Sequence, residues 1–143
     1  MPADPLFDLV AAFNRGSLDI PEGFLTPNTT YTLNTRPYEE LLGASPEDPL
    51  IRLLARGAAG YRTAATALQY ALQHPVVTIK DRLGDQRASS TAVLKVDGVL
   101  RGSGAAFTGY FTLQLITKND RLASVDVSCA LEDLELIREA RKR

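Results

Sequence analysis

Apolar residues recur every three or four positions up to about residue 72, whereas from Pro75 onward apolar and polar residues alternate. The first spacing matches one face of an α-helix, and the second matches the two faces of a β-strand. The pattern therefore predicts an α+β protein in which helices come first and a run of strands follows.

The first half predicts an amphipathic helix and one strand. Asp4 and Pro5 are typical of a helix start, and apolar residues at helical spacing continue from there until Arg15-Gly16. Residues 17–28 are rich in turn formers and predict a loop. Residues 29–34, "TTYTLN", then predict a strand with Tyr31 and Leu33 on the same side.

Two further helices are expected before the sheet. The stretch "RPYEELLG", residues 36–43, predicts a short helix, and the capping pattern "SPED" at 45–48 predicts the start of a longer one. Its apolar stripe continues to Leu72. Gly57 and Gly60 interrupt this stripe without a strand before them or a Lys-Ser/Thr pair after them, so we interpret them as points of close helix packing, with a bend near Gly57.

The second half predicts four consecutive antiparallel strands: "VVTIKDRL", "RASSTAVLKV", "AAFTGYFTLQLIT" and "RLASVDVSC". The predicted turns are "GDQ", "DG" at Asp97-Gly98 with the loop after it, and "KND" at 118–120. The last segment, "LEDLELIREARKR", predicts a brief helix or a frayed tail.

Alternation along these strands divides the sheet into an apolar and a polar face. The expected apolar face contains Val77, Ile79, Ala88, Ser90, Ala92, Leu94, Val96, Phe111, Leu113, Leu115, Val125, Val127 and Cys129. The expected polar face contains Thr78, Lys80, Arg82, Arg87, Ser89, Thr91, Lys95, Tyr110, Thr112, Gln114, Ser124, Asp126 and Ser128. Helices should cover the apolar face. A β-bulge between Leu122 and Asp126 would instead turn the Asp126 carboxylate inward.

Composition narrows the functional classes. With 143 residues, 45% hydrophobic and 23% charged, the chain fits one globular domain over residues 1–143. A net charge of -1 argues against nucleic acid and membrane surfaces as partners. One cysteine and one histidine cannot form a disulfide or a Cys/His metal site, and no cofactor motif is present. The N-terminal residues lack a signal-peptide pattern, so we expect a cytoplasmic protein.

The element order, together with the closing "TGYFTLQLITKNDRLASVDV", resembles the NTF2-like superfamily, also called SnoaL-like or cystatin-like. The resemblance implies a cone in which N-terminal helices cover one face of a curved antiparallel sheet of about five strands. It also implies a pocket between sheet and helices, and a homodimer formed through the polar outer face of the sheet.

Members of this superfamily include ketosteroid isomerases, polyketide cyclases, epoxide hydrolases, dehydratases and non-catalytic binding domains. The isomerases use a tyrosine and two carboxylates in an apolar pocket, yet the expected apolar face contains no Asp or Glu. The epoxide hydrolases use an arginine flanked by two aspartates around a water. Arg87 and Asp126 are remote counterparts of the arginine and one aspartate, and Ser89 stands where the other carboxylate would be needed. His74, at the helix-to-strand junction, fits a junction role better than a dehydratase role.

We therefore expect a non-catalytic domain that dimerises and holds a small apolar ligand, with no metal and no cofactor. The expected ligand-binding residues are Tyr31, Tyr61, Ser90, Phe111 and Leu113, and Cys129 is expected to be an inert buried thiol. The alternative is an isomerase, cyclase or hydratase acting on a small hydrophobic substrate. That alternative has Asp126 as its catalytic candidate, and only if a bulge turns it inward.

Overall fold

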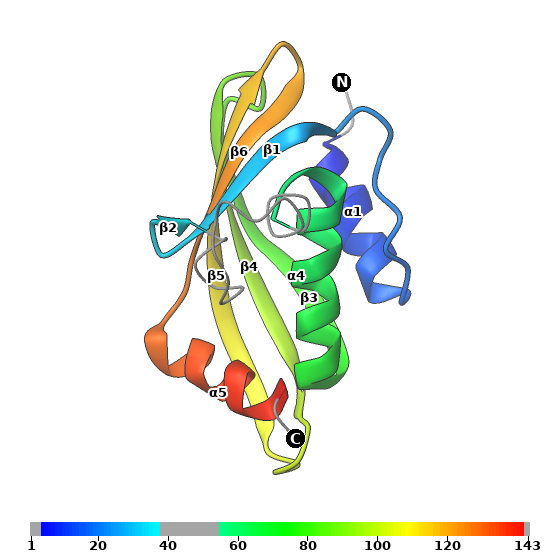
Figure 1. Ribbon diagram of the computed structural model, residues 1–143, viewed down its shortest axis with the longest axis vertical. Helices are drawn as coiled ribbons and strands as arrows, with labels where there is room; N and C mark the ends of the chain where they lie inside the picture. Colours follow the sequence, from blue (N-terminus) through cyan, green and yellow to red (C-terminus); the bar gives the residue numbers. More distant parts are fainter. Residues whose placement is uncertain (1–3, 38–54, 142–143) are drawn as a thin grey trace.

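The computed structural model describes residues 4–37 and 55–141. Helices and a curved sheet form the two layers of an α+β fold (Figure 1). In chain order the elements are α1 (Pro5–Asn14), β1 (Leu25–Leu33), β2 (Arg36–Pro37), α4 (Gly57–Ala71), β3 (Leu72–Gly84), β4 (Ser89–Leu100), β5 (Ala106–Lys118), β6 (Arg121–Ser128) and α5 (Leu131–Arg141).

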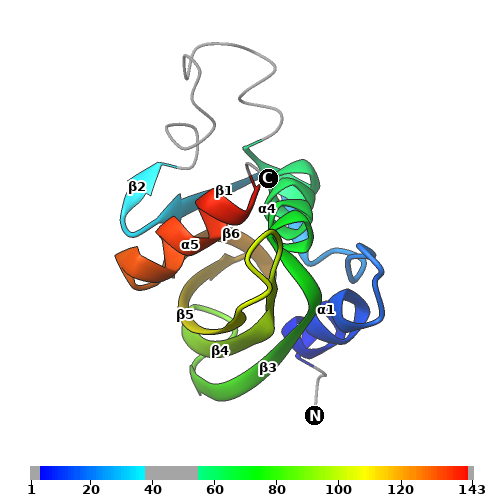
Figure 2. The same cartoon turned by 90° about the horizontal axis from the view of Figure 1, so that it is seen from below.

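The strands form one sheet in the order β2-β1-β6-β5-β4-β3. All neighbouring pairs are antiparallel except β1 and β6, which are parallel. The expected curved sheet of about five strands is present. In the described residues it has six strands, one of them only two residues long, and its one parallel pair makes it a mixed sheet. The sheet is curved; Figure 2 shows α4 and α5 over its concave side and α1 beside the edge strand β3.

Helix α1 forms as predicted. The Asp4 side chain accepts a hydrogen bond from the Leu6 backbone N–H at 3.1 Å, and Pro5 occupies the first helical position. Leu6, Leu9 and Phe13 are buried against the sheet. Local capping and the apolar stripe agree here, which is why the sequence places this helix correctly.

The prediction of one continuous long helix is wrong around residues 56 and 57, where the chain is extended and then turns. Arg56 is extended and forms a bridge with Thr30, and α4 begins only at Gly57, where φ is +59°. A Cβ at Gly57 would lie 2.9 Å from the carbonyl oxygen of Thr26, so the chain turns sharply at a position that only glycine tolerates. The predicted start at 45–48 lies outside the described residues.

Two other predicted boundaries change. Arg36–Pro37 pairs with the end of β1 as strand β2 rather than starting a helix, and the remainder of that predicted helix, 38–43, lies outside the described residues. Asp97-Gly98 is inside β4 rather than in a turn. Glycine at position 98 leaves room for the Leu72 side chain, which a Cβ at this position would approach to 3.1 Å. The turn after β4 instead uses Gly102 and Gly104, both at positive φ.

Two β-bulges change which way side chains face. In β3 the register shifts between Ile79 and Asp81, so Arg82 turns toward the helices while Leu83 is 62% exposed. Arg82 was expected on the polar face, and that expectation is wrong: its Nε lies 2.7 Å from Asp4 Oδ2. In β6 a shift after Leu122 buries that leucine.

Buried side chains form two clusters between sheet and helices. One is centred on Phe13, Leu72 and Phe107, and the other on Leu6 and Leu115. Val10, Tyr61 and Leu94 are partly buried and pack against both clusters. The space between the two clusters is the candidate site. No helix in residues 4–37 and 55–141 has the length and apolar character needed to cross a membrane.

Candidate functional site: an apolar cavity under the helices

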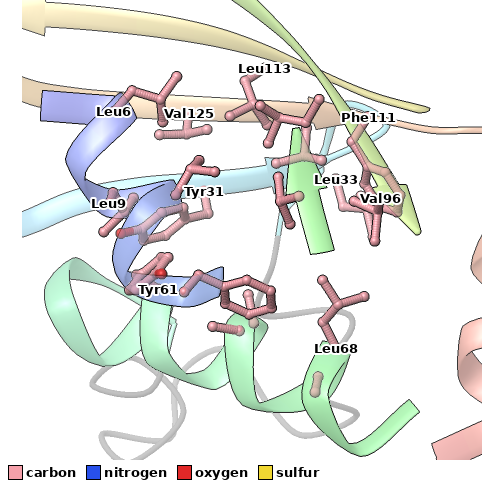
Figure 3. Close-up of a pocket in the computed structure, with 18 of the residues that line it drawn as sticks. Leu6, Leu9, Tyr31, Leu33, Tyr61, Leu68, Val96, Phe111, Leu113 and Val125 are labelled. Atoms are coloured by element: carbon pink, nitrogen blue, oxygen red, sulfur yellow. The ribbon is translucent and has the colours of Figure 1, made fainter. Parts of the chain in front are cut away.

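A cavity of about 330 Å³ lies between the sheet and helices α1, α4 and α5 (Figure 3). It falls at the lower end of the range for small-molecule sites in proteins. Aliphatic and phenyl side chains form most of its wall: Leu6, Leu9, Val10, Phe13, Phe24, Leu25, Leu33, Ala64, Ala65, Ala67, Leu68, Val77, Leu94, Val96, Phe111, Leu113, Leu115, Leu122, Val125, Val127, Leu134 and Ile137. The remaining lining residues are Tyr31, Thr32, Tyr61 and Arg138.

Four of the five predicted ligand-binding residues line this cavity: Tyr31, Tyr61, Phe111 and Leu113. The fifth, Ser90, is buried but is not part of the wall. It lies beside Gly84 on the neighbouring strand, where a Cβ would come within 3.0 Å of the Ser90 Cα. The cavity thus contains most of the predicted set, while ligand binding by these residues stays a prediction.

Tyr31 is fixed by two glycines of α4. Its hydroxyl donates a hydrogen bond to the carbonyl oxygen of Gly57 at 2.7 Å. Its ring packs on Gly60, where a Cβ would lie only 2.6 Å from the ring carbon Cε2. The spacing "GAAGY" therefore accommodates a tyrosine from β1, which confirms the interpretation of these glycines as points of close packing.

Tyr61 extends into the cavity from the first turns of α4, next to Tyr31 (Figure 3). Within the described residues its hydroxyl has no hydrogen-bond partner. No buried polar side-chain atom there lacks a partner, so this oxygen is accessible rather than sealed in the core. Burial raises the pKa of Tyr61 above its ordinary value of 10.0, with a smaller opposing effect from Arg62. The phenol is thus a neutral donor available to a ligand.

Arg138 is the only charged side chain among the lining residues that the structure describes. It comes from α5 and is 45% exposed, so its guanidinium lies at the rim rather than deep inside. Its Nη1 lies 3.2 Å from Glu135 Oε1 one helical turn earlier.

The Asp126 carboxylate lies on the opposite face of the sheet, as predicted. It accepts hydrogen bonds from the Thr32 hydroxyl and, at 3.1 Å, from the Thr35 backbone N–H. These bonds hold the β1–β2 turn, where Asn34 and Thr35 both have positive φ. A β-bulge between Leu122 and Asp126, which would have turned Asp126 inward, does occur in β6, but it turns Leu122 inward instead.

The other chemical candidates lie outside the cavity. His74 is exposed near the start of β3, with φ of +53°, where the register shifts between Gln73 and Val76; its junction role stays a prediction. Cys129 is half-buried rather than buried, and it is absent from the cavity wall. Burial raises the pKa of its thiol, a hydrogen bond with Asn34 lowers it, and Asp133 raises it further. No group of three metal-ligating side chains occurs in the described part of the chain.

Sequence reasoning missed the contribution of α5. Leu134, Ile137 and Arg138 close one end of the cavity, although this segment was expected to be a brief helix or a tail. Leu134 and Ile137 follow Leu131 at helical spacing, and this spacing was the available signal.

Neither a protein-family model nor any curated protein matches this sequence. Solved structures do match its fold. A SnoaL-like polyketide cyclase from Agrobacterium tumefaciens has 14% identity and a TM-score of 0.67, over 94% of this chain and 97% of the other.

A protein of ketosteroid isomerase-like fold from Catenulispora acidiphila, crystallised with trimethylamine, has 14% identity and a TM-score of 0.66 over 93% and 90% of the two chains. TerC, co-crystallised with polyporic acid, has 12% identity and a TM-score of 0.65 over 94% and 95%. These similarities show that the chain has the NTF2-like cone fold.

Proposed function

We propose that this protein binds a small, mainly apolar organic molecule in the cavity between the sheet and helices α1, α4 and α5. The observation that carries the proposal is an empty space of about 330 Å³ whose described wall is almost wholly aliphatic and aromatic. Tyr61 supplies one hydrogen-bond donor that could orient a ligand oxygen. Apolar walls with few polar groups are typical of ligand sites. The small molecules crystallised with two neighbours of this fold are consistent with such a role.

Binding can be tested with N-phenyl-1-naphthylamine, a neutral probe whose fluorescence rises in apolar surroundings. The wild-type protein should enhance the fluorescence in a saturable manner. Leu113→Phe replaces an aliphatic side chain of the cavity wall with a larger aromatic one, and should weaken probe binding at least tenfold. Leu83→Phe is the matched control, because Leu83 lies outside the cavity and is 62% exposed. Absence of saturable binding, or equal effects of both substitutions in folded protein, would refute the proposal.

The second candidate function is an isomerase or cyclase, favoured by the SnoaL-like and isomerase-like neighbours. The described cavity wall contains no carboxylate or imidazole, so among these residues proton transfer or carbonyl polarisation would fall to Tyr61. The raised pKa of Tyr61 favours the neutral phenol, which donates a hydrogen bond well but is a poor base at neutral pH.

This alternative can be tested by following conversion of a β,γ-unsaturated steroid ketone to its conjugated isomer by absorbance. We expect no conversion above the background rate. Conversion that survives Asp126→Asn but disappears in Tyr61→Phe would establish the catalytic function, and Tyr61 would then be its active group.

We further propose a homodimer that forms through the outer face of the sheet. Tyr110 and Val76 are exposed there, at 54% and 48%. The charge of Lys95 is partly compensated by Asp97, whose Oδ2 lies 3.8 Å from the Lys95 Nζ. Tyr110→Lys should shift native mass spectra from dimer to monomer. Tyr70→Lys, on the exposed side of α4, should leave the dimer unchanged, and a monomeric wild type would overturn the proposal.

A further inference from the structure

The cavity is elongated along α4. Tyr61 and Leu68 both line it, and seven residues of an α-helix span about 10 Å. Figure 3 shows the pair Tyr31 and Tyr61 toward one end and Leu68 and Phe111 toward the other. Helix α5 packs against α4 and supplies Leu134, Ile137 and Arg138 to the wall. A ligand that fills this space therefore has one end near a phenol and the other near α5.

At the α5 end of the cavity, the guanidinium of Arg138 makes fewer hydrogen bonds than it has N–H donors. Arg138 donates to Glu135 through Nη1, and no other described group accepts a hydrogen bond from its guanidinium. A guanidinium has five N–H donors arranged to fit a carboxylate. Because Leu134 and Ile137 lie beside it in the wall, a charged group bound to Arg138 would remain at the rim while its apolar body entered the cavity.

We propose that the ligand is an amphiphilic acid: an elongated apolar body with a carboxylate at the end nearest α5, bound there by Arg138. This inference rests on the proposed function, since it assigns the class of molecule that the cavity takes. The negative charge of Glu135, whose Oε1 lies 3.2 Å from Arg138 Nη1, opposes a ligand carboxylate bound to the same guanidinium.

The test uses displacement of N-phenyl-1-naphthylamine by two ten-carbon competitors, decanoate and decan-1-ol, which differ in their end group. Arg138→Gln should weaken decanoate binding about two- to fivefold, the range expected for a partly exposed ion pair, and leave decan-1-ol unchanged. Arg121→Gln removes the same charge from an exposed position outside the cavity wall, and should change neither. Glu135→Gln should strengthen decanoate binding, because it removes the opposing negative charge.

Three results would overturn the inference. The first is an unchanged decanoate affinity in Arg138→Gln, and the second is a weakened decanoate affinity in Glu135→Gln. The third is an equal loss of affinity for acid and alcohol in Arg138→Gln, which would indicate a structural role for Arg138. All three differ from failure of the proposed function, in which the neutral probe itself would not bind the wild-type protein.

Discussion

The side-chain amide of Asn14 forms two hydrogen bonds with the backbone of Val77. Its Nδ2 donates to the Val77 carbonyl, and its Oδ1 accepts from the Val77 N–H, both at 2.8 Å. Asn14 ends α1, and β3 is the edge strand of the sheet. At the other end of α1, Asp4 pairs with Arg82, and these side chains are only 9% and 14% exposed. The helix is thus fastened to the edge strand at both ends and covers an edge that would otherwise be open to other chains.

Asn14→Ala should destabilise the protein by about 2 kcal/mol, since each lost hydrogen bond contributes about 1 kcal/mol. Chemical denaturation provides the measurement. Asn28→Ala, at an exposed position in β1, is the control and should change stability by less than about 0.5 kcal/mol. Equal effects of the two substitutions would show that the Asn14 pair does not stabilise α1.

Gly60→Ala should destabilise the fold by about 1 kcal/mol or more, although alanine is the better helix former by a similar amount. The added methyl group would clash with the Tyr31 ring and with the backbone of Ala55. The loss should shrink in a Tyr31→Leu background, where the ring is absent. A thermodynamic cycle from urea denaturation checks this, and an identical loss in both backgrounds would rule out the ring as the cause.

Thr35→Gly should stabilise the protein by about 1 kcal/mol. Thr35 has φ of +68°, which strains a β-branched residue, and the Asn34–Thr35 turn requires positive φ at both positions. Asp126→Ala should have the opposite effect, because it removes the bonds from Thr32 and Thr35 that hold this turn. Thermal unfolding distinguishes the two directions, and a loss of stability in Thr35→Gly would contradict the argument.

Stability should fall at alkaline pH partly because of Tyr61. Its pKa is raised in the folded state above the ordinary 10.0, so the unfolded chain ionises first as pH rises. The stabilising contribution is complete below pH 10 and is lost as pH rises through the higher folded value. The free energy of unfolding, obtained from denaturation curves between pH 8 and 11, should fall less steeply with pH in Tyr61→Phe than in the wild type. An unchanged slope would exclude this contribution.

The sequence predicted α1, the four-strand meander, the outward position of Asp126 and the inward position of Tyr31, because all of these follow from local alternation and capping. It could not place Arg82 or Leu122, since a one-residue bulge reverses alternation and leaves no mark in the pattern itself. The turn predicted at Asp97-Gly98 was wrong for a different reason. The pair Asp-Gly is typical of a turn, but here Gly98 lies inside β4 and makes room for the Leu72 side chain.

The cavity itself was less accessible to sequence reasoning than the residues around it. Alternation identifies which side chains face inward, but whether they fill the space depends on how far α4 stands from the sheet. That separation is set by contacts such as Tyr31 on Gly60, which join segments distant in sequence. The participation of Arg138 depends in the same way on where α5 docks.

The parallel pairing of β1 with β6 joins residues 25–33 to residues 121–128, nearly opposite ends of the chain. A ribosome must therefore synthesise most of the polypeptide before β1 can meet β6. Until then, the two-residue strand β2 is the one neighbouring strand of the described sheet that β1 can pair with. Such distant closure is slow because the ends of a long segment must find each other first. Completion of the sheet, and with it the wall that Tyr31 contributes, should be among the last events of folding.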